Sequence, residues 1–342
     1  MTVFDDAWLD DRASLAGADD VLRRLASAGA RLRREFAESV QPTSRLHEMP
    51  RPRAVVAAGA EARFIRAIVE PVCPVPFVAW AAHGLPGWVG ALDLVVVLAS
   101  DAADVGLIST VHEAVRRGAQ LIIACPVGSA ISEHASGTST TLLPTSTGDI
   151  LAAAIVALTG MHVMQLAPEV QPDRICEAMD RVAEDCSPFL DVTENPAKEI
   201  ALGLAEAQPL IWGGSVLAAR ASRRVAEAVR AASGRAALAA DVDALLPVLD
   251  AAAPRDPFAD PFEDLGSSDR RPSLSVLDDG TSDDWVSAGR ARLLAAADRN
   301  DVRVSVIAHQ QGSAVERYAA LLQTGMYAAV YLAVGLGRYL EL

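Results

Sequence analysis

The sequence predicts an α/β protein made of two halves, each built around a parallel β-sheet. Short apolar runs of strand length alternate with stretches of helical periodicity, and parallel strands joined by crossover helices are the usual solution for this pattern. Some runs, such as residues 94–99, are apolar throughout, as expected for strands that are covered on both faces. The alternation stops near residue 160 and resumes near residue 208, which indicates two sheets.

The N-terminal half begins with helices and continues with five strands. Apolar residues at near-helical spacing, such as Leu22, Leu25 and Leu32, predict one or two helices with a polar face in the first 40 residues. The strands are expected at residues 54–58, 76–80, 94–99, 121–125 and 140–143. The helices between them are expected at residues 61–69, 104–117 and 148–159.

A charged, helical stretch from residue 161 to 206 joins the halves. Within it, Asn195 is expected to cap a helix whose first turn holds Pro196. Strands are then expected at residues 209–212, 236–240, 273–277 and 302–308, and helices at residues 215–232, 243–252, 283–299 and 312–340. The Pro- and Asp-rich residues 254–272 predict an exposed acidic loop.

These patterns divide the chain into four expected segments. They are an N-terminal helical segment (1–50), a first sheet domain (51–160), a helical connector (161–206) and a second sheet domain (207–342).

The charge balance excludes several classes of partner. Among 342 residues, 30 are basic and 44 acidic, a net charge of −14. Nucleic-acid binding needs a concentrated basic surface, and adhesion to an anionic membrane needs one as well. We therefore expect neither nucleic acid nor a membrane as a partner. Lys198 is the only lysine, so a P-loop is also excluded.

The sequence lacks the motifs of a signal peptide, a metal site and a dinucleotide-binding loop, and these absences determine the compartment and cofactors that we expect. The acidic start has no basic segment followed by an apolar core, as a signal peptide would. The four cysteines are scattered without a Cys-x-x-Cys, and the histidines lack metal-ligand spacing. No Gly-x-Gly-x-x-Gly follows a strand. We expect a cytoplasmic protein with no cofactor and no metal.

Ligands of parallel sheets bind at the carboxyl ends of the strands, where helices begin. Small or polar residues follow five of the expected strands. The candidates at these junctions are Gly59, Ser100, the loop of Thr145, Ser146 and Thr147, then Ser215 and His309.

Three stretches resemble a known family. Residues 83–89 (His-Gly-Leu-Pro-Gly-Trp-Val) are similar to its Gly-Leu-Pro-x-Trp-Val turn, and residues 195–201 to its interdomain helix start. Residues 325–333 (Gly-Met-Tyr-Ala-Ala-Val-Tyr-Leu-Ala) are similar to its C-terminal helix. The chain thus resembles double sugar-isomerase-domain (SIS) proteins, in particular the bifunctional phosphoglucose/phosphomannose isomerases. The resemblance implies two SIS-type, flavodoxin-like parallel-sheet sandwich domains in tandem.

The same resemblance exposes departures in the phosphate-binding loops. Where the family has a loop similar to Ser-Tyr-Ser-Gly-Asn-Thr, this chain has Ala99, Ser100, Asp101, Ala102, Ala103 and Asp104. Like charges a few ångströms apart repel by about 1 kcal/mol in water and by several times more in a partly desolvated pocket. Asp104 either faces the ligand or caps the following helix, and the hydroxyls of residues 145–147 either bind the ligand or cap a helix.

The catalytic positions depart as well. An aldose–ketose isomerase uses a carboxylate base through an enediol, which the family presents in a His-Asn-Glu motif. Residues 238–245 match that stretch but contain neither histidine nor glutamate, so Asp241 or Asp243 would have to act, unless Asp243 is a helix cap. The resemblance makes Arg220 and Glu227 further binding candidates. His309 is either the ring-opening group or a hydrogen-bonded loop histidine.

Two functions therefore remain open. The first is a SIS-fold protein with a degenerate site that binds a sugar phosphate, or a related small metabolite, or acts in regulation. The second is an active phosphosugar isomerase, an intramolecular oxidoreductase with a rearranged site that interconverts glucose 6-phosphate or mannose 6-phosphate with fructose 6-phosphate. Whether the protein is an enzyme stays open. By the resemblance we expect a homodimer, with the C-terminal helix around Tyr327 and Tyr331 either in the core or at the dimer face.

Overall fold

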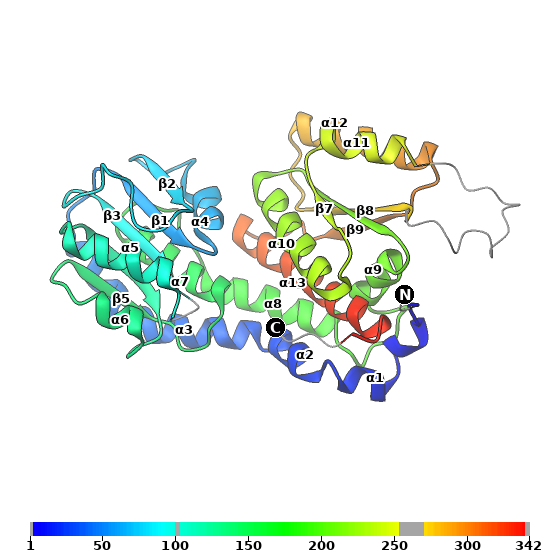
Figure 1. Ribbon diagram of the computed structural model, residues 1–342, viewed down its shortest axis with the longest axis horizontal. Helices are drawn as coiled ribbons and strands as arrows, with labels where there is room; N and C mark the ends of the chain where they lie inside the picture. Colours follow the sequence, from blue (N-terminus) through cyan, green and yellow to red (C-terminus); the bar gives the residue numbers. More distant parts are fainter. Residues whose placement is uncertain (1–2, 100–102, 253–269, 339–342) are drawn as a thin grey trace, which may run out of the picture. The chain divides into compact units, whose positions relative to one another are not determined.

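The computed structural model describes residues 3–99, 103–252 and 270–338, which belong to two compact units (Figure 1). The first sheet unit comprises residues 28–176. The second sheet unit comprises residues 177–342 together with the first 27 residues of the chain. The segment boundaries expected from the sequence remain predictions.

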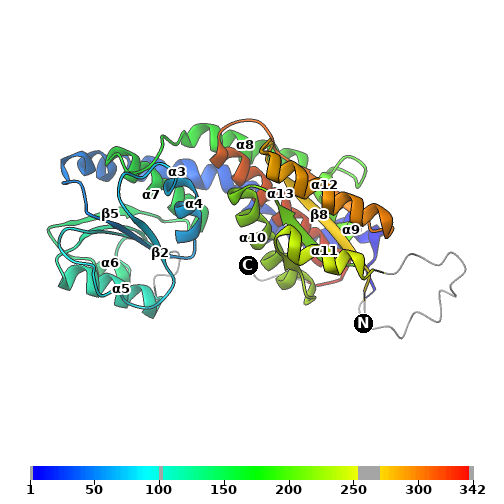
Figure 2. The same cartoon turned by 90° about the horizontal axis from the view of Figure 1, so that it is seen from above.

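The first sheet unit is a five-stranded parallel sheet between two helix layers. Its strand order is β2-β1-β3-β4-β5, the flavodoxin-like order. Helices α3, α4 and α7 cover one face, and α5 and α6 cover the other (Figure 2). The strands are β1 (Val55–Gly59), β2 (Phe77–Trp80), β3 (Leu94–Leu98), β4 (Gln120–Cys125) and β5 (Thr140–Pro144). The helices are α3 (Ala28–Ser44), α4 (Ala62–Val69), α5 (Val105–Arg116), α6 (Ala130–His134) and α7 (Ile150–Val163), and η2 (Arg45–Glu48) is a short 3-10 helix.

The second sheet unit repeats the design with four parallel strands in the order β7-β6-β8-β9. Helices α9, α10 and α13 lie on one face, and α11 and α12 on the other (Figure 1). The strands are β6 (Gln208–Gly213), β7 (Leu238–Ala239), β8 (Pro272–Asp278) and β9 (Val304–Ala308). The helices are α9 (Pro196–Leu204), α10 (Val216–Ser233), α11 (Val242–Asp250), α12 (Asp284–Arg299) and α13 (Ala314–Gly335), while α8 (Pro172–Asp185) spans the boundary between the units.

Helix α13 is the core helix of its unit. It is long and apolar enough to cross a membrane, yet 89% of its apolar window is buried inside the protein. Tyr327 and Tyr331 are fully buried, so these two side chains belong to the core rather than to an exposed dimer face.

The N-terminal residues are tied to this core. They form η1 (Asp6–Leu9), α1 (Arg12–Ala16) and α2 (Asp19–Ala26), and both η1 and α2 pack against α13. The amide of Asp5 donates to the carbonyl of Gly335 (2.8 Å). Lys198, fully buried, donates to a carboxylate oxygen of Asp10 (2.8 Å) and to the carbonyls of Leu190 (2.6 Å) and Pro188 (3.2 Å).

The expected α/β alternation is confirmed. The nine strands of the described residues lie where the sequence predicts them, although β7 is only two residues long. Asn195 caps α9, accepting from the amides of Ala197 and Lys198, and Pro196 occupies its first turn, as predicted. The short helix α6 was missed: its capping Ser129 was visible, but five residues give little periodicity. The acidic loop 254–272 lies almost wholly outside the described residues.

Candidate functional site

Gly59 ends β1 at the edge where a ligand is expected. Its φ of +111° is rare for residues with a side chain, and a Cβ there would lie 2.2 Å from the carbonyl oxygen of Leu98. Glycine is required so that the ends of β1 and β3 can approach each other. The position is explained by packing alone.

The loop after β3 is described only in part. Ser100 and Asp101 lie outside the described residues. Asp104 caps α5, and its Oδ1 accepts from the amide of Leu107 (3.0 Å). The helix-cap interpretation of Asp104 is therefore confirmed.

The hydroxyls of the loop between β5 and α7 contact carboxylates of α3. Glu35 Oε1 accepts from the amide of Thr147 (3.0 Å) and also from the Thr147 hydroxyl. One helical turn further, Glu38 Oε2 accepts from the Ser146 hydroxyl (3.2 Å). Thr145 is buried, and its amide donates to the carbonyl of Cys125 (3.1 Å). Two of the three residues expected to bind a phosphate, Ser146 and Thr147, are thus bound by the chain's own acids.

A further carboxylate, Asp149, caps the helix that follows this loop. Its Oδ1 accepts from the amides of Leu151 (3.0 Å) and Ala152 (3.1 Å). Its Oδ2 accepts from Arg31 of α3 (2.6 and 3.1 Å). The N-cap of α7 is therefore Asp149 and not a threonine. The Thr147 hydroxyl accepts a hydrogen bond from the amide of Asp149 (3.3 Å).

Glu35 is the buried member of this acidic group. Its side chain is fully enclosed, and Oε2 has no hydrogen-bond partner in the described part of the chain. Burial raises the pKa of Glu35, the hydrogen bonds from Thr147 oppose the rise, and the nearby charges of Asp149 and Glu38 add to it. The ionised form of Glu35 is thus less favoured than that of a carboxyl group in water.

The second sheet unit has a similar arrangement where β6 ends. Ser215 caps α10 by accepting from the amide of Ala218 (3.0 Å), and its own hydroxyl donates to Asp279 Oδ2. Asp279 follows β8 and is buried; its Oδ1 accepts from the amide of Thr281 (3.2 Å). Here too a strand-end hydroxyl is bound by a buried carboxylate.

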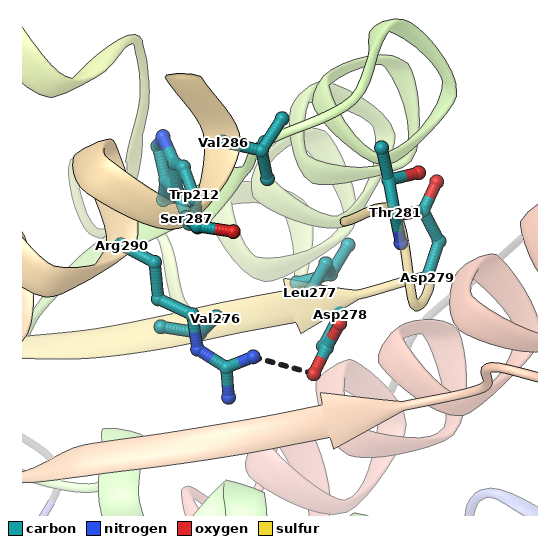
Figure 3. A pocket seen from close by; sticks show the side chains of 10 residues that line it. Trp212, Val276, Leu277, Asp278, Asp279, Thr281, Val286, Ser287 and Arg290 are labelled. Carbon is teal, nitrogen blue, oxygen red and sulfur yellow. Dashed lines mark hydrogen bonds and ion pairs between the residues drawn. The ribbon is translucent and has the colours of Figure 1, made fainter. Parts of the chain in front are cut away.

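A small pocket lies beside these residues, at the carboxyl ends of β6 and β8 (Figure 3). Arg290 of α12 pairs with Asp278 at 2.6 Å, and Gln310 donates to the same carboxylate (2.9 Å). Burial opposes ionisation of Asp278, but the bonds from the Gly280 amide, Arg290 and Gln310 outweigh it and lower its pKa. Asp278 is therefore ionised at neutral pH. The pocket is lined by Trp212, Gly214, Val276, Leu277, Asp278, Asp279, Thr281, Val286, Ser287 and Arg290.

His309 follows β9 and contacts α13. Its Nε2 lies 2.9 Å from the hydroxyl oxygen of Thr324, which donates its own proton to the carbonyl of Ala320 (3.0 Å). Nε2 must then carry the hydrogen, which leaves Nδ1 as an acceptor in the neutral ring. Burial lowers the pKa of His309, and the charge of Asp185 opposes that shift.

The remaining candidates lie away from this histidine. The side chain of Asp243 is 83% exposed and pairs with Arg292 at 3.1 Å. Asp241 caps α11 by accepting from the amide of Ala244 (3.1 Å), so the cap expected at Asp243 is wrong by two residues. Glu227 pairs with Arg224 on α10.

Arg220, also on α10, is buried. No hydrogen bond or ion pair between described residues joins Asp243 to His309, and the roles of all these residues stay predictions.

Sequence reasoning missed Glu35 and Asp279. Glu35 lies 112 residues from Thr147, so no local pattern announces the contact. For Asp279 a signal exists, because two successive aspartates directly follow an apolar strand. Among the residues that the structure describes, no group of three or more His, Cys, Asp or Glu could hold a metal ion.

Comparisons with known proteins agree with this architecture. Residues 193–338 match the family model of the bacterial phospho-glucose isomerase C-terminal SIS domain. No curated protein sequence matches the chain.

Two solved structures share the fold over nearly the whole chain. The C-terminal domain of glucosamine-fructose-6-phosphate aminotransferase from Francisella tularensis is 11% identical, with a TM-score of 0.66, over 92% of this chain and 96% of that one. Tagatose-6-phosphate ketose/aldose isomerase from Escherichia coli is 12% identical, with a TM-score of 0.60, over 97% and 91%. The protein therefore has the tandem SIS fold, and its residues 193–338 are similar to the bacterial phospho-glucose isomerase C-terminal SIS domain.

Proposed function

We propose that this protein is a non-catalytic member of the SIS fold that binds a carbohydrate derivative or acts in regulation. One observation carries the proposal: strand-end hydroxyls in both sheet units are held by buried carboxylates, Thr147 by Glu35 and Ser215 by Asp279. A phosphate needs such donors to replace the water it loses on binding.

The charges strengthen this argument. A phosphate that reached the loop after β5 would have to displace Glu35 from Thr147 while Glu38 and Asp149 lie close by. An unpaired like charge at a few ångströms opposes binding by about 1 kcal/mol in water and about 4 kcal/mol near a protein surface. Arg34 and Arg31 pair with Glu38 and Asp149 and reduce their share of this repulsion. The loop is therefore a poor phosphate site.

The catalytic candidates give independent support. An isomerase needs its base within hydrogen-bond reach of the transferred proton. Asp243 instead pairs with Arg292 on the surface, and Asp241 caps a helix. Among the described residues, neither carboxylate forms a hydrogen bond or ion pair with His309, the group suited to ring opening.

The rival function is an active isomerase, and His309 is the observation that favours it. Its partly buried imidazole is neutral at pH 7 and keeps Nδ1 as a proton acceptor. In that case Asp241 or Asp243 would supply the base and Arg220 would bind the substrate.

An assay of the purified protein separates the two functions. Glucose 6-phosphate, mannose 6-phosphate and fructose 6-phosphate are each incubated with the protein, and interconversion is followed by NMR. We expect no turnover above the buffer. Turnover that disappears in both His309→Gln and Asp243→Asn would establish the isomerase instead.

Assembly and location remain proposals as well. We propose a cytoplasmic homodimer, in which the buried residues of α13 stay in the core of each subunit. Light scattering at micromolar concentration gives the mass, and a monomeric mass would contradict the dimer.

A further inference from the structure

The sheet of the second sheet unit has an open edge at β9. Its strand order is β7-β6-β8-β9, whereas the first sheet unit has the order β2-β1-β3-β4-β5. The second order repeats the first four positions of the first order and then stops. Within the described ranges, β9 therefore ends its sheet at the position where the first sheet unit adds β5.

The backbone of β9 presents hydrogen-bonding groups along this edge. The carbonyl of Arg303 accepts from the amide of Leu274 of β8 (2.9 Å), and the amide of His309 donates to the carbonyl of Asp278 (2.9 Å). The odd-numbered residues of this stretch therefore face β8. Successive residues of a strand direct their amides and carbonyls to opposite sides, so three residues present theirs to the open side: Val304, Val306 and Ala308.

This edge is apolar and lacks the features that usually keep sheet edges from pairing. Residues 304–308 read Val-Ser-Val-Ile-Ala, without a charge or a proline, and their register with β8 is continuous, without a bulge. Val306, at the centre, is 47% exposed, and Ala308 is exposed as well. Half-buried Leu294 lies on the side of α12 opposite the two arginines that pair with α11. An uncovered apolar edge strand is a template for pairing with another chain.

A second copy of β9 complements this edge when it runs antiparallel and places its own Val306 opposite Val306. Val304 of each copy then lies opposite Ala308 of the other. Each of these three pairs exchanges two hydrogen bonds, so all outward amides and carbonyls of both strands are satisfied. A two-fold axis at Ser305 or Ile307 would instead leave one outward residue of each strand without an opposite residue. The backbone therefore favours an axis at Val306.

The same register brings no like charges together along the strand. Arg303 lies opposite His309, whose pKa is lowered by burial, and Ser305 lies opposite Ile307. The net charge of −14 on each chain opposes association at longer range. Salt screens this repulsion, so association through the uncharged edge should strengthen as salt rises.

We propose that the protein dimerises by antiparallel pairing of β9 with β9 of a second copy, across a two-fold axis at Val306. The two four-stranded sheets would then continue into each other. The inference rests on the homodimer proposed above and holds whether or not the protein is catalytic.

Charges placed at the axis test the pairing. Val306→Lys and Val306→Glu each bring two like charges together, so light scattering at micromolar concentration should give the monomer mass for both. An equimolar mixture of the two variants brings opposite charges together and should restore the dimer mass, which also shows that both variants fold. The control Val216→Lys adds the same charge at a site at the start of α10 that is 66% exposed and should leave the dimer intact. A dimer in both single variants, or a mixture that stays monomeric, would overturn the proposal.

Backbone hydrogen exchange tests the pairing without a substitution. As the protein concentration rises through the dissociation constant, the amides of Val304, Val306 and Ala308 should exchange at least tenfold more slowly. Mass spectrometry of a peptide that covers β9 measures this change. Protection that does not depend on concentration would mean that another segment of the same chain covers the edge, and it would overturn the proposal.

The outcomes separate this interface from the proposals on which it is built. A native chain that is monomeric at every concentration removes both the homodimer and the interface. A dimer that survives both charge variants leaves the homodimer and removes only the interface. Neither result changes the proposed non-catalytic function, which the NMR assay of sugar-phosphate interconversion decides.

Discussion

Glu35 of α3 accepts hydrogen bonds from both the amide and the hydroxyl of Thr147, in the loop between β5 and α7. The carboxyl group thus takes both donors that Thr147 could offer an anion. Glu38 accepts from the hydroxyl of the neighbouring Ser146 (3.2 Å). The first sheet unit keeps the architecture of a ligand-binding sheet, while its own acids occupy the donors at the end of β5.

This contact predicts how stability changes with pH. Burial raises the pKa of Glu35 above its ordinary value of 4.5, so between these two pKa values the folded chain holds more protons than the unfolded one. Stability must then fall as pH rises through that window. Glu35→Gln keeps an acceptor for Thr147 but cannot ionise, so we expect it to gain stability over the native chain from pH 4 to 8. Urea unfolding measures the difference, and a difference that is constant with pH would contradict the assignment.

Gly59 provides a test of the strand-end geometry. A Cβ at this position would meet the Leu98 carbonyl at 2.2 Å and would sit on a φ of +111°. We expect Gly59→Ala to lower the free energy of unfolding by about 3 kcal/mol or more, from backbone strain of about 1–3 kcal/mol and the clash. The control is Gly87→Ala, where a Cβ has nothing within 4 Å and the change should stay within about 0.5 kcal/mol. Equal losses from the two variants would contradict the geometry.

The burial of Lys198 predicts how its amine reacts and how much its replacement destabilises the fold. This residue is the only lysine, fully buried, with its ammonium held by Asp10 and two carbonyls. An amine-reactive reagent should modify this side chain only after unfolding, which mass spectrometry of the digested protein detects. Modification in the folded protein would contradict the burial.

Replacing the lysine should be costly. We expect Lys198→Met to destabilise by about 3 kcal/mol, near the lower end for breaking a buried ion pair, because the half-exposed Asp10 regains water. The control Arg23→Met breaks an exposed pair with Asp19 and should cost less than about 1 kcal/mol. Calorimetric or urea unfolding gives both values, and a Lys198→Met cost no greater than the control would rule out a structural role.

His309 predicts a second, opposite pH effect. Burial lowers its pKa below the ordinary 6.5, so the unfolded chain holds more protons between the two values, and stability falls as pH drops through that window. His309→Gln keeps a donor for Thr324 but does not titrate, so it should be less sensitive to acid. An unchanged slope of stability between pH 5 and 7 would show that His309 does not lie in this buried setting.

Local sequence patterns predicted the helices and strands well, because each pattern depends only on residues that are close together in the sequence. The apolar run at β3 and the Asn195–Pro196 helix start depend on neighbouring residues alone, and Asp104 caps α5 as a strand-to-helix junction suggests. The resemblance to SIS proteins added the tandem arrangement, which the sheet orders confirm.

The chemistry of the site was harder to predict, because it depends on contacts between distant residues. Glu35 meets Thr147 across 112 residues, and Asp279 meets Ser215 across 64. Both hydroxyls were expected as ligand-binding groups, and nothing near them in the sequence shows that a carboxylate lies opposite. Asp243 looked available as a base, but its partner Arg292 is 49 residues away on α12.

The central claim is that this SIS-fold protein does not carry out isomerase chemistry. An enediol mechanism exchanges the proton on carbon 2 of glucose 6-phosphate with solvent, even when little product accumulates. The protein is therefore incubated with glucose 6-phosphate in D2O, and the carbon 2 proton is followed by NMR. We predict that its signal decays no faster than in buffer. Faster decay that is lost in His309→Gln would contradict the account.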